Sequence, residues 1–281
     1  MTTFALSTAE QNVQAALSIP KMSHAEAGKL AKTEYQRLLS LVESLEGKDW
    51  EQQTYCTEWR VRELVAHLAG ACAAFASWDE FKRQMIQNPY RKDYDMQVDA
   101  INKCQVEDRA GRSEQELVAE FREKTPKAIQ TRQRLPWLLR HLPVPFGPPL
   151  GTKPVQYLTD TIYTRDEWMH RYDICAATGK MMETTPEHDG RLMDLNVLEL
   201  GQRLKSKIGG RTIDLMLTGD IEGAYRFGGQ DEPGAALEID VYDYNLLASG
   251  RITADEAASR VKMSGNRADA SWFLSNIEIP Y

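Results

Sequence analysis

Asp166 and His170 are the residues whose types and spacing are best suited to chemistry in this chain. They lie four positions apart in a segment expected to be helical, so both side chains project from one helical face. Asp166 also falls on the apolar stripe of that helix, where an unpaired buried carboxylate is costly or changes its pKa. The segment therefore needs a metal ion or another strong partner for this charge.

A third ligand is available from a separate helix. Of the five histidines in the chain, His67 and His170 are the two expected on core-facing helices. Together with Asp166 they would give three ligands and an open fourth position, the pattern of catalytic zinc sites. Nickel, iron(II) and manganese accept the same nitrogen and oxygen donors. Glu167 is the alternate carboxylate ligand, because it forms Glu-x-x-His with His170; a di-iron centre needs a second such pair, and the sequence has none.

The same residues also fit a helical bundle without a metal. Asp166 would then accept a hydrogen bond from a histidine or pair with Arg165 or Arg171. On the residues alone both interpretations stay open. Three small neighbours of His67 indicate room there for something other than protein: Gly70, Ala71 and Ala74.

Hydrophobic periodicity predicts a helical region followed by a small α+β module. Helices are expected from the capping box at Ser23 to about Glu46, over 57–86 with a break near Ser77, over 94–139 with interruptions near Gly111 and Pro126, over 153–178 ending at Gly179, and over 186–207. A proline-rich loop at 142–150 is expected to cross over and wall a pocket. After Gly209, strands are expected at 212–217, 224–227, 236–241 and 261–264, with short helices at 242–249, 254–259 and 266–276.

These elements predict a mainly α fold with three parts. Residues 1–22 form an N-terminal arm, residues 23–208 a helical bundle, and residues 209–281 a small α+β domain. The net charge of −7 argues against nucleic acid as a partner, and no apolar run approaches the length of a membrane span. The four cysteines form no Cys-x-x-Cys pair, so we expect reduced thiols in a cytoplasmic protein. The sequence is compatible with a homodimer, but it shows no obvious exposed apolar face that would require one.

Four stretches of the sequence resemble the DinB-like metalloenzymes, most closely the mycothiol-dependent maleylpyruvate isomerase family. Residues 50–68 (WEQQTYCTEWRVRELVAHL) are similar to the first metal-ligand helix of that family. Residues 165–174 (RDEWMHRYDI) are similar to its second, usually written Glu-x-x-x-His followed by Asp-Ile. Residues 105–110 (QVEDRA) and 116–118 (ELV) resemble its middle region. The similarity spans most of residues 25–205, and the C-terminal module looks like the sterol-carrier-like domain that often follows.

The resemblance implies an up-and-down four-helix bundle that holds one divalent metal, most simply zinc, through His67, Asp166 and His170. This chain has aspartate where the family more often has glutamate. The resemblance further implies a low-molecular-weight thiol such as mycothiol as co-substrate, and isomerisation or S-transfer on a small electrophile. Arg62, Arg165 and Arg171 are candidates for binding a carboxylate or the thiol, because guanidinium pairs bidentately with carboxylate.

Two other classes of function remain alternatives. One is a metal-dependent hydrolase built on the same bundle, in which water replaces the thiol. The other is a non-catalytic protein that binds a small molecule or lipid through the C-terminal module. The sequence does not identify the substrate.

Overall fold

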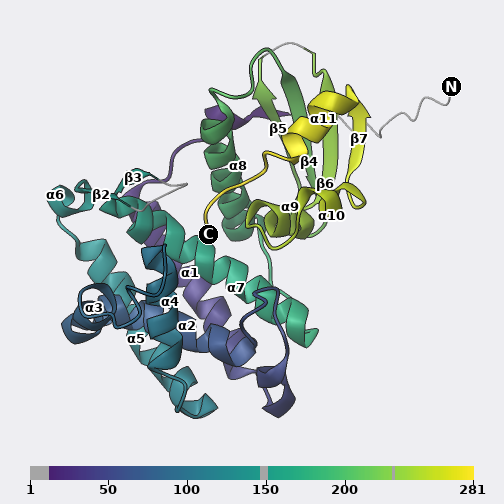
Figure 1. The fold of residues 1–281 in the computed structure, drawn as a ribbon. Helices are drawn as coiled ribbons and strands as arrows, with labels where there is room; N and C mark the ends of the chain where they lie inside the picture. Colours follow the sequence, from purple (N-terminus) through teal and green to yellow (C-terminus); the bar gives the residue numbers. More distant parts are fainter. Residues whose placement is uncertain (1–12, 146–150, 230–231) are drawn as a thin grey trace. The chain divides into compact units, whose positions relative to one another are not determined.

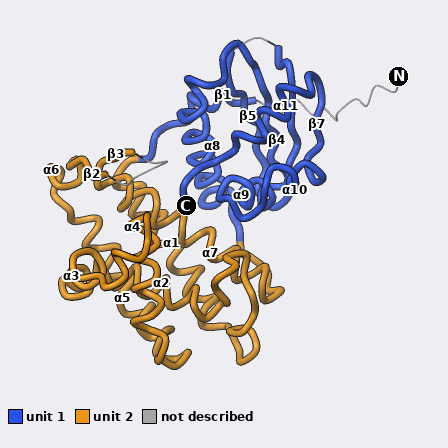
Figure 2. The backbone as a smooth tube through the Cα atoms, viewed as in Figure 1, with its two compact units in different colours: residues 1–22, 184–280 blue, residues 23–183, 281 orange. Residues whose placement is uncertain are grey.

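The computed structural model describes residues 13–145, 151–229 and 232–281. The chain forms two compact units (Figure 2): a helical unit, Ser23–Glu183 with Tyr281, and an α+β unit, Met1–Met22 with Thr184–Pro280. The units divide at Thr184, whereas the sequence analysis placed a domain boundary after residue 208. The helix that follows Thr184 therefore belongs with the C-terminal sheet.

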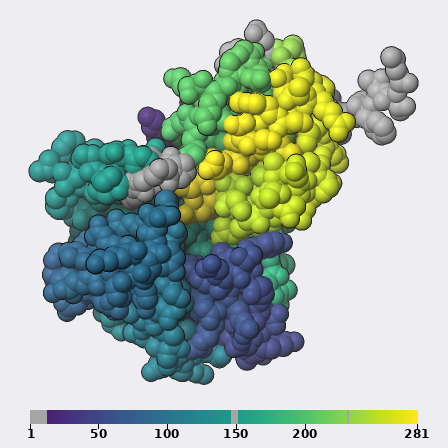
Figure 3. All heavy atoms as spheres, in the orientation of Figure 1, coloured from purple at the N-terminus to yellow at the C-terminus, as the bar shows by residue number. Residues whose placement is uncertain are grey.

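Four long helices form the core of the helical unit: α1 (His24–Glu43), α2 (Val61–Ala76), α5 (Glu114–Arg134) and α7 (Tyr163–Thr178). Both α5 and α7 pack against α1 and α2, so the four helices surround one core (Figure 1). α3 (Trp78–Met85) and α4 (Gln97–Glu107) pack against α2 and against each other. Their outer faces, in blue, lie on the surface of this unit (Figure 3). The short elements are η2 (Gly47–Glu51), α6 (Trp137–Arg140) and η3 (Tyr157–Ile162).

The helices begin where the sequence supplies caps and pack through apolar stripes. Ser23 with Glu26 and Ser113 with Glu116 form the capping boxes of α1 and α5, as their spacing predicts. The expected break at Ser77 separates α2 from α3, and Gly179 ends α7 in a left-handed conformation. Fully buried side chains at helical spacing fill the core between the long helices, among them Leu38, Leu64, Leu68, Leu117 and Phe121. None of the described helices is long and apolar enough to cross a membrane.

The expected interruption at Pro126 is wrong, because α5 runs through this residue. A proline inside a helix removes the N–H that would bond the carbonyl four residues earlier, here that of Arg122. The hydroxyl of Tyr35 on α1 donates to the Arg122 carbonyl at 3.0 Å and so replaces the missing donor. A tertiary contact thus compensates for the proline, and local propensity alone could not reveal it.

The proline-rich stretch forms part of a short hairpin. β2 (Pro143–Pro145) pairs antiparallel with β3 (Thr152–Pro154). Each strand of this two-stranded sheet is an edge strand, where a proline is tolerated although it lacks the N–H donor. The helix expected from Lys153 consequently starts later, at η3. The tip of the loop, residues 146–150, lies outside the described residues, so its expected role as a pocket wall stays a prediction.

The α+β unit contains a mixed five-stranded sheet in the order β1-β5-β4-β6-β7. The strands are β1 (Gln14–Ala15), β4 (Thr212–Thr218), β5 (Gly223–Gly228), β6 (Ala235–Asp240) and β7 (Lys262–Gly265), and the helical elements are η1 (Ala16–Ser18), η4 (Pro186–Gly190), α8 (Arg191–Leu204), α9 (Val241–Ala248), α10 (Ala254–Ala258) and α11 (Arg267–Leu274). The predicted β4–β5 hairpin is present. The N-terminal arm differs from expectation, because Gln14 and Ala15 add a parallel edge strand beside β5. The likeness of this unit to a sterol-carrier-like domain stays a prediction.

A buried ion pair joins α1 to α7. The Arg171 Nε and Nη2 atoms lie 2.6 and 3.1 Å from the two carboxylate oxygens of Glu34. The side chains are 2% and 0% exposed. Removing one charge would leave the other without its partner in the core.

We expect Glu34→Gln to lower the free energy of unfolding by about 3–5 kcal/mol, because it removes the carboxylate that pairs with the buried charge of Arg171. Urea denaturation measures this change. Glu43→Gln is the matched control, since it removes the exposed pair between Glu43 and Arg122 and should cost about 0–1 kcal/mol. Equal losses in the two variants would contradict the expectation.

We expect Tyr35→Phe to cost about 0.5–1.5 kcal/mol, because it removes the donor to the Arg122 carbonyl while keeping the ring. In a Pro126→Ala background the same change should cost less, since the new backbone N–H then bonds that carbonyl. Denaturation of the four proteins in this double-mutant cycle measures the coupling. Additive losses would show that the hydroxyl does not substitute for the missing N–H.

Candidate metal centre

α2 and α7 bring together the three residues that the sequence analysis proposed as ligands. The Asp166 Oδ2 atom lies 3.3 Å from the His67 Nε2 atom, and its Oδ1 atom lies 3.2 Å from the His170 Nε2 atom. The two imidazole rings meet edge to face, with centroids 5.2 Å apart. The shorter aspartate side chain therefore reaches both histidines.

One donor atom from each of the three side chains lies within 4.8 Å of the other two, close enough for the group to share a metal ion. Bonds of about 2.0–2.1 Å in a tetrahedral site place neighbouring donors about 3.3–3.4 Å apart. The histidine side chains are 7% and 5% exposed, but that of Asp166 keeps 23% of its surface. The cluster thus opens to solvent on the side of its carboxylate.

The other nitrogen of each ring is already engaged. The His170 Nδ1 atom lies 2.9 Å from the Oδ2 atom of Asp173, which is completely buried. The His67 Nδ1 atom lies 2.8 Å from the Oε1 atom of Gln105 on α4. In a neutral ring whose Nδ1 donates, Nε2 carries a lone pair. Two such lone pairs facing one carboxylate are stable only with a positive charge between them, either a proton or a metal ion.

The charges of the cluster strongly perturb one another. Burial alone would raise the pKa of Asp166, but His170 and His67 hold it well below its usual range. Burial alone would lower the pKa of His170, but the charge of Asp166 and hydrogen bonds to Asp166 and Asp173 raise it well above its ordinary value. The carboxylate is therefore ionised and available as an oxygen ligand.

The turn before α2 places an aromatic side chain over the histidines. The Trp59 ring centroid lies 4.9 Å from that of His67 and 6.2 Å from that of His170. The Trp59 N–H donates to the Cys56 carbonyl at 2.8 Å, and the Thr54 hydroxyl donates to the Trp59 carbonyl at 2.8 Å. These hydrogen bonds define the turn and account for the spacing of Thr54, Cys56 and Trp59 in residues 50–68.

The alternate ligand Glu167 has different surroundings from Asp166. Its side chain is buried, and its Oε1 atom accepts from the Cys72 Sγ atom at 3.8 Å. Burial raises the pKa of Glu167 to about 8. Within the described part of the chain, Glu167 is not among the groups of side chains close enough to share a metal ion.

The three candidate arginines have separate environments. Arg171 is committed to Glu34, Arg165 is buried, and an Arg62 Nη2 atom donates to the Arg112 carbonyl. Their proposed role in binding a carboxylate or thiol stays a prediction.

The room expected beside Gly70 is occupied by protein. A Cβ atom placed on Gly70 would lie 2.6 Å from the Gln105 Cβ atom and 3.0 Å from the Arg109 Nη1 atom. The glycine therefore permits close approach of α4 to α2, and the space is not a ligand cavity. Sequence reasoning could not identify which helix would fill it.

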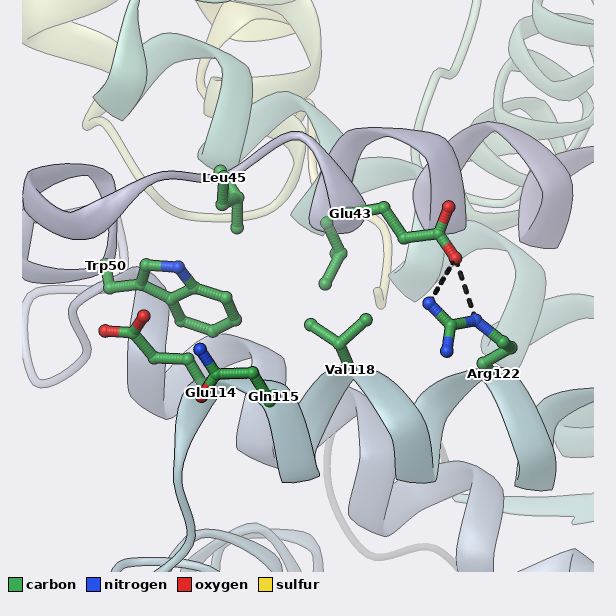
Figure 4. Close-up of a pocket in the computed structure, with 8 residues that line it drawn as sticks. Glu43, Leu45, Trp50, Glu114, Gln115, Val118 and Arg122 are labelled. Atoms are coloured by element: carbon green, nitrogen blue, oxygen red, sulfur yellow. Dashed lines mark hydrogen bonds and ion pairs between the residues drawn. The ribbon is translucent and has the colours of Figure 1, made fainter.

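A surface hollow of about 470 Å³ lies elsewhere in the helical unit (Figure 4). It is lined by residues of α1, η2 and α5, with Trp50 and Val118 facing it and the Glu43–Arg122 ion pair at one end. The residues of the His67–Asp166–His170 cluster do not line it.

Sequence reasoning missed the roles of Asp173 and Gln105 around the cluster. Asp173 had a detectable signal, because it lies about one helical turn after His170 in the same predicted helix. Gln105 appeared only as part of the QVEDRA stretch, with no chemistry assigned to it.

Comparisons with known proteins agree with this architecture. Residues 31–175 match the family described as mycothiol maleylpyruvate isomerase N-terminal domain. A crystal structure of a mycothiol-dependent maleylpyruvate isomerase superposes with a TM-score of 0.57 at 14% sequence identity, covering 86% of this chain and 93% of that one. A histidine-to-alanine mutant of such an enzyme gives a TM-score of 0.56 with the same identity and coverage. No curated protein sequence matches the chain. The family match covers more than half of the sequence, so this chain belongs to the mycothiol maleylpyruvate isomerase N-terminal domain family.

Proposed function

We propose that this protein is a metal-dependent enzyme that uses a low-molecular-weight thiol to isomerise a small electrophile or transfer sulfur to it. The observation that carries the proposal is the convergence of the His67 and His170 Nε2 atoms on Asp166, with both Nδ1 atoms engaged elsewhere. Membership of a family named for mycothiol supports the choice of thiol. Zinc is the favoured metal, with nickel, iron(II) and manganese as alternatives.

The chain's own residues prepare the site for a cation. His67, Asp166 and His170 would hold it, and a cation there would keep a bound thiol ionised at neutral pH. Asp173 and Gln105 orient the two imidazoles, as hydrogen-bonding partners of ligand histidines do in metal sites. Trp59 covers one side of the rings and limits access of water.

The thiol is expected to come from outside the chain, because three of the four cysteines are buried and therefore poor nucleophiles. Cys72, Cys104 and Cys175 are buried. Burial raises the pKa of Cys72 far above its ordinary value, that of Cys104 to about 12 and that of Cys175 to about 11. The Cys56 thiol points to the buried carboxylate of Asp173 at 3.8 Å.

The proposed reaction is reversible addition to an activated double bond. The thiolate sulfur bonds to one alkene carbon, and the alkene electron pair moves to the activating group. The resulting single bond rotates, the electron pair re-forms the double bond, and the thiolate leaves unchanged. The net result is cis–trans isomerisation, and a good leaving group on the substrate would instead give S-transfer.

We expect one divalent ion to bind per chain and to stabilise the fold. Zinc at about 100 times its dissociation constant should add about 2.7 kcal/mol to the free energy of unfolding. Asp166→Asn and His67→Ala should lose most of this gain, whereas His141→Ala, at an exposed histidine, should keep it. Elemental analysis and denaturation with and without metal are the measurements. A wild-type protein that neither binds nor is stabilised by any of the four metals would refute the proposal.

We expect a thiol to bind directly at the metal. In the cobalt-substituted protein, adding mycothiol or another cellular thiol should produce a sulfur-to-metal charge-transfer band, because the thiolate occupies the open position. Methylated thiols serve as controls and should give no band. A metal-loaded protein that gives no band with any thiol would exclude thiol transfer and favour the hydrolase alternative.

A further inference from the structure

A chain of buried amide side chains ends on His67. The Gln84 Nε2 atom lies 2.9 Å from the Gly70 carbonyl, and the Gln84 Oε1 atom lies 2.9 Å from the Gln105 Nε2 atom. The Gln105 Oε1 atom then lies 2.8 Å from the His67 Nδ1 atom. Gln84, Gln105 and His67 are 1%, 2% and 5% exposed, so water does not compete freely for these hydrogen bonds.

The direction of every hydrogen bond in this chain follows from its first acceptor. A backbone carbonyl only accepts, so Gln84 must turn its amide NH₂ towards Gly70. The same NH₂ lies 3.1 Å from a Glu80 carboxylate oxygen, which requires the same orientation. The Gln84 oxygen therefore faces Gln105 and can only accept from its NH₂. Gln105 is left with its oxygen towards His67, and that oxygen needs a proton on Nδ1.

The backbone of Gln105 is held independently of these side-chain bonds. The Arg109 Nη1 atom donates to the Gln105 carbonyl at 3.2 Å. The Arg109 Nε and Nη2 atoms each lie 2.8 Å from a Glu120 oxygen, and this pair is almost fully buried, so it ties the turn after α4 to α5. The close approach at Gly70 sets the distance between α4 and α2. Gln105 and Arg109, both from the QVEDRA stretch, thus belong to one packed region beside α2, the helix that carries His67.

We propose that Gln105, aligned by Gln84, is a positioning residue that fixes the proton of neutral His67 on Nδ1 and so presents the Nε2 lone pair to the cation site. The assigned tautomer rests on the directions of the hydrogen bonds from Gln84 through Gln105 to His67, whereas its consequence for metal binding rests on the proposed function. Without the Gln105 acceptor, the tautomer protonated on Nε2 becomes the more stable one. Its N–H can donate a hydrogen bond to the Asp166 Oδ2 atom, which lies 3.3 Å from Nε2. That tautomer blocks the ligand atom.

The tautomer is measurable in the metal-free protein. Nitrogen-15 NMR of the histidine rings, at a pH where His67 is neutral, should show a protonated Nδ1 and an unprotonated Nε2 in the wild type. In Gln105→Leu the population should shift to the Nε2-protonated form. Gln105→Glu keeps an acceptor and should keep the wild-type tautomer. Gln97→Leu, an exposed glutamine on the same helix, is the matched control.

The second readout is the affinity for zinc, measured by competition with a chelator. We expect Gln105→Leu to bind about 10- to 100-fold more weakly than wild type, and Gln105→Glu to lose less. A wild-type His67 protonated on Nε2 overturns the proposal even if the leucine variant does not fold. A folded leucine variant with wild-type tautomer and affinity also overturns it. Failure of the wild type to bind any metal would refute the proposed function and leave the tautomer result standing.

Discussion

The candidate site depends on one electrostatic constraint: two imidazole nitrogens face the same carboxylate. Asp166 can be ionised in this partly buried position only because His67 and His170 approach it from two helices. The histidines, in turn, can point their Nε2 atoms inward only because Gln105 and Asp173 accept at Nδ1. Removing any partner would leave a buried polar group unsatisfied, which is more costly than losing one hydrogen bond.

The helical architecture supplies this constraint through packing between sequence-distant segments. α7 contributes a carboxylate and an imidazole one turn apart, and its contact with α2 brings the second imidazole to them. α4 then approaches α2 closely enough for Gln105 to reach His67, which Gly70 permits by having no Cβ. The loop before α2 adds Trp59 over the rings. Four separate segments therefore meet around a cluster of three side chains.

Sequence reasoning succeeded where a local pattern decides the structure. The capping boxes at Ser23 and Ser113, the end at Gly179 and the β4–β5 hairpin follow from neighbouring residues. The convergence of His67 with Asp166 and His170 was accessible because apolar periodicity placed them on buried faces. The continuity of α5 through Pro126, the edge strand at Gln14 and the filling of the space beside Gly70 depend on distant partners. No local pattern encodes these contacts, so single-sequence reasoning had no access to them.

The buried charges of α7 serve two different purposes. The Arg171–Glu34 pair joins helices, and apolar residues of matching volume can often replace such a pair without loss of stability. Asp166 differs, because its side chain keeps 23% of its surface and faces the Nε2 atoms of two histidines. Stability alone would not select a carboxylate there, since it must be desolvated and then neutralised by the histidines. A carboxylate beside an opening to solvent instead suits a ligand that enters from outside, and this physical distinction separates the proposed centre from an ordinary polar core.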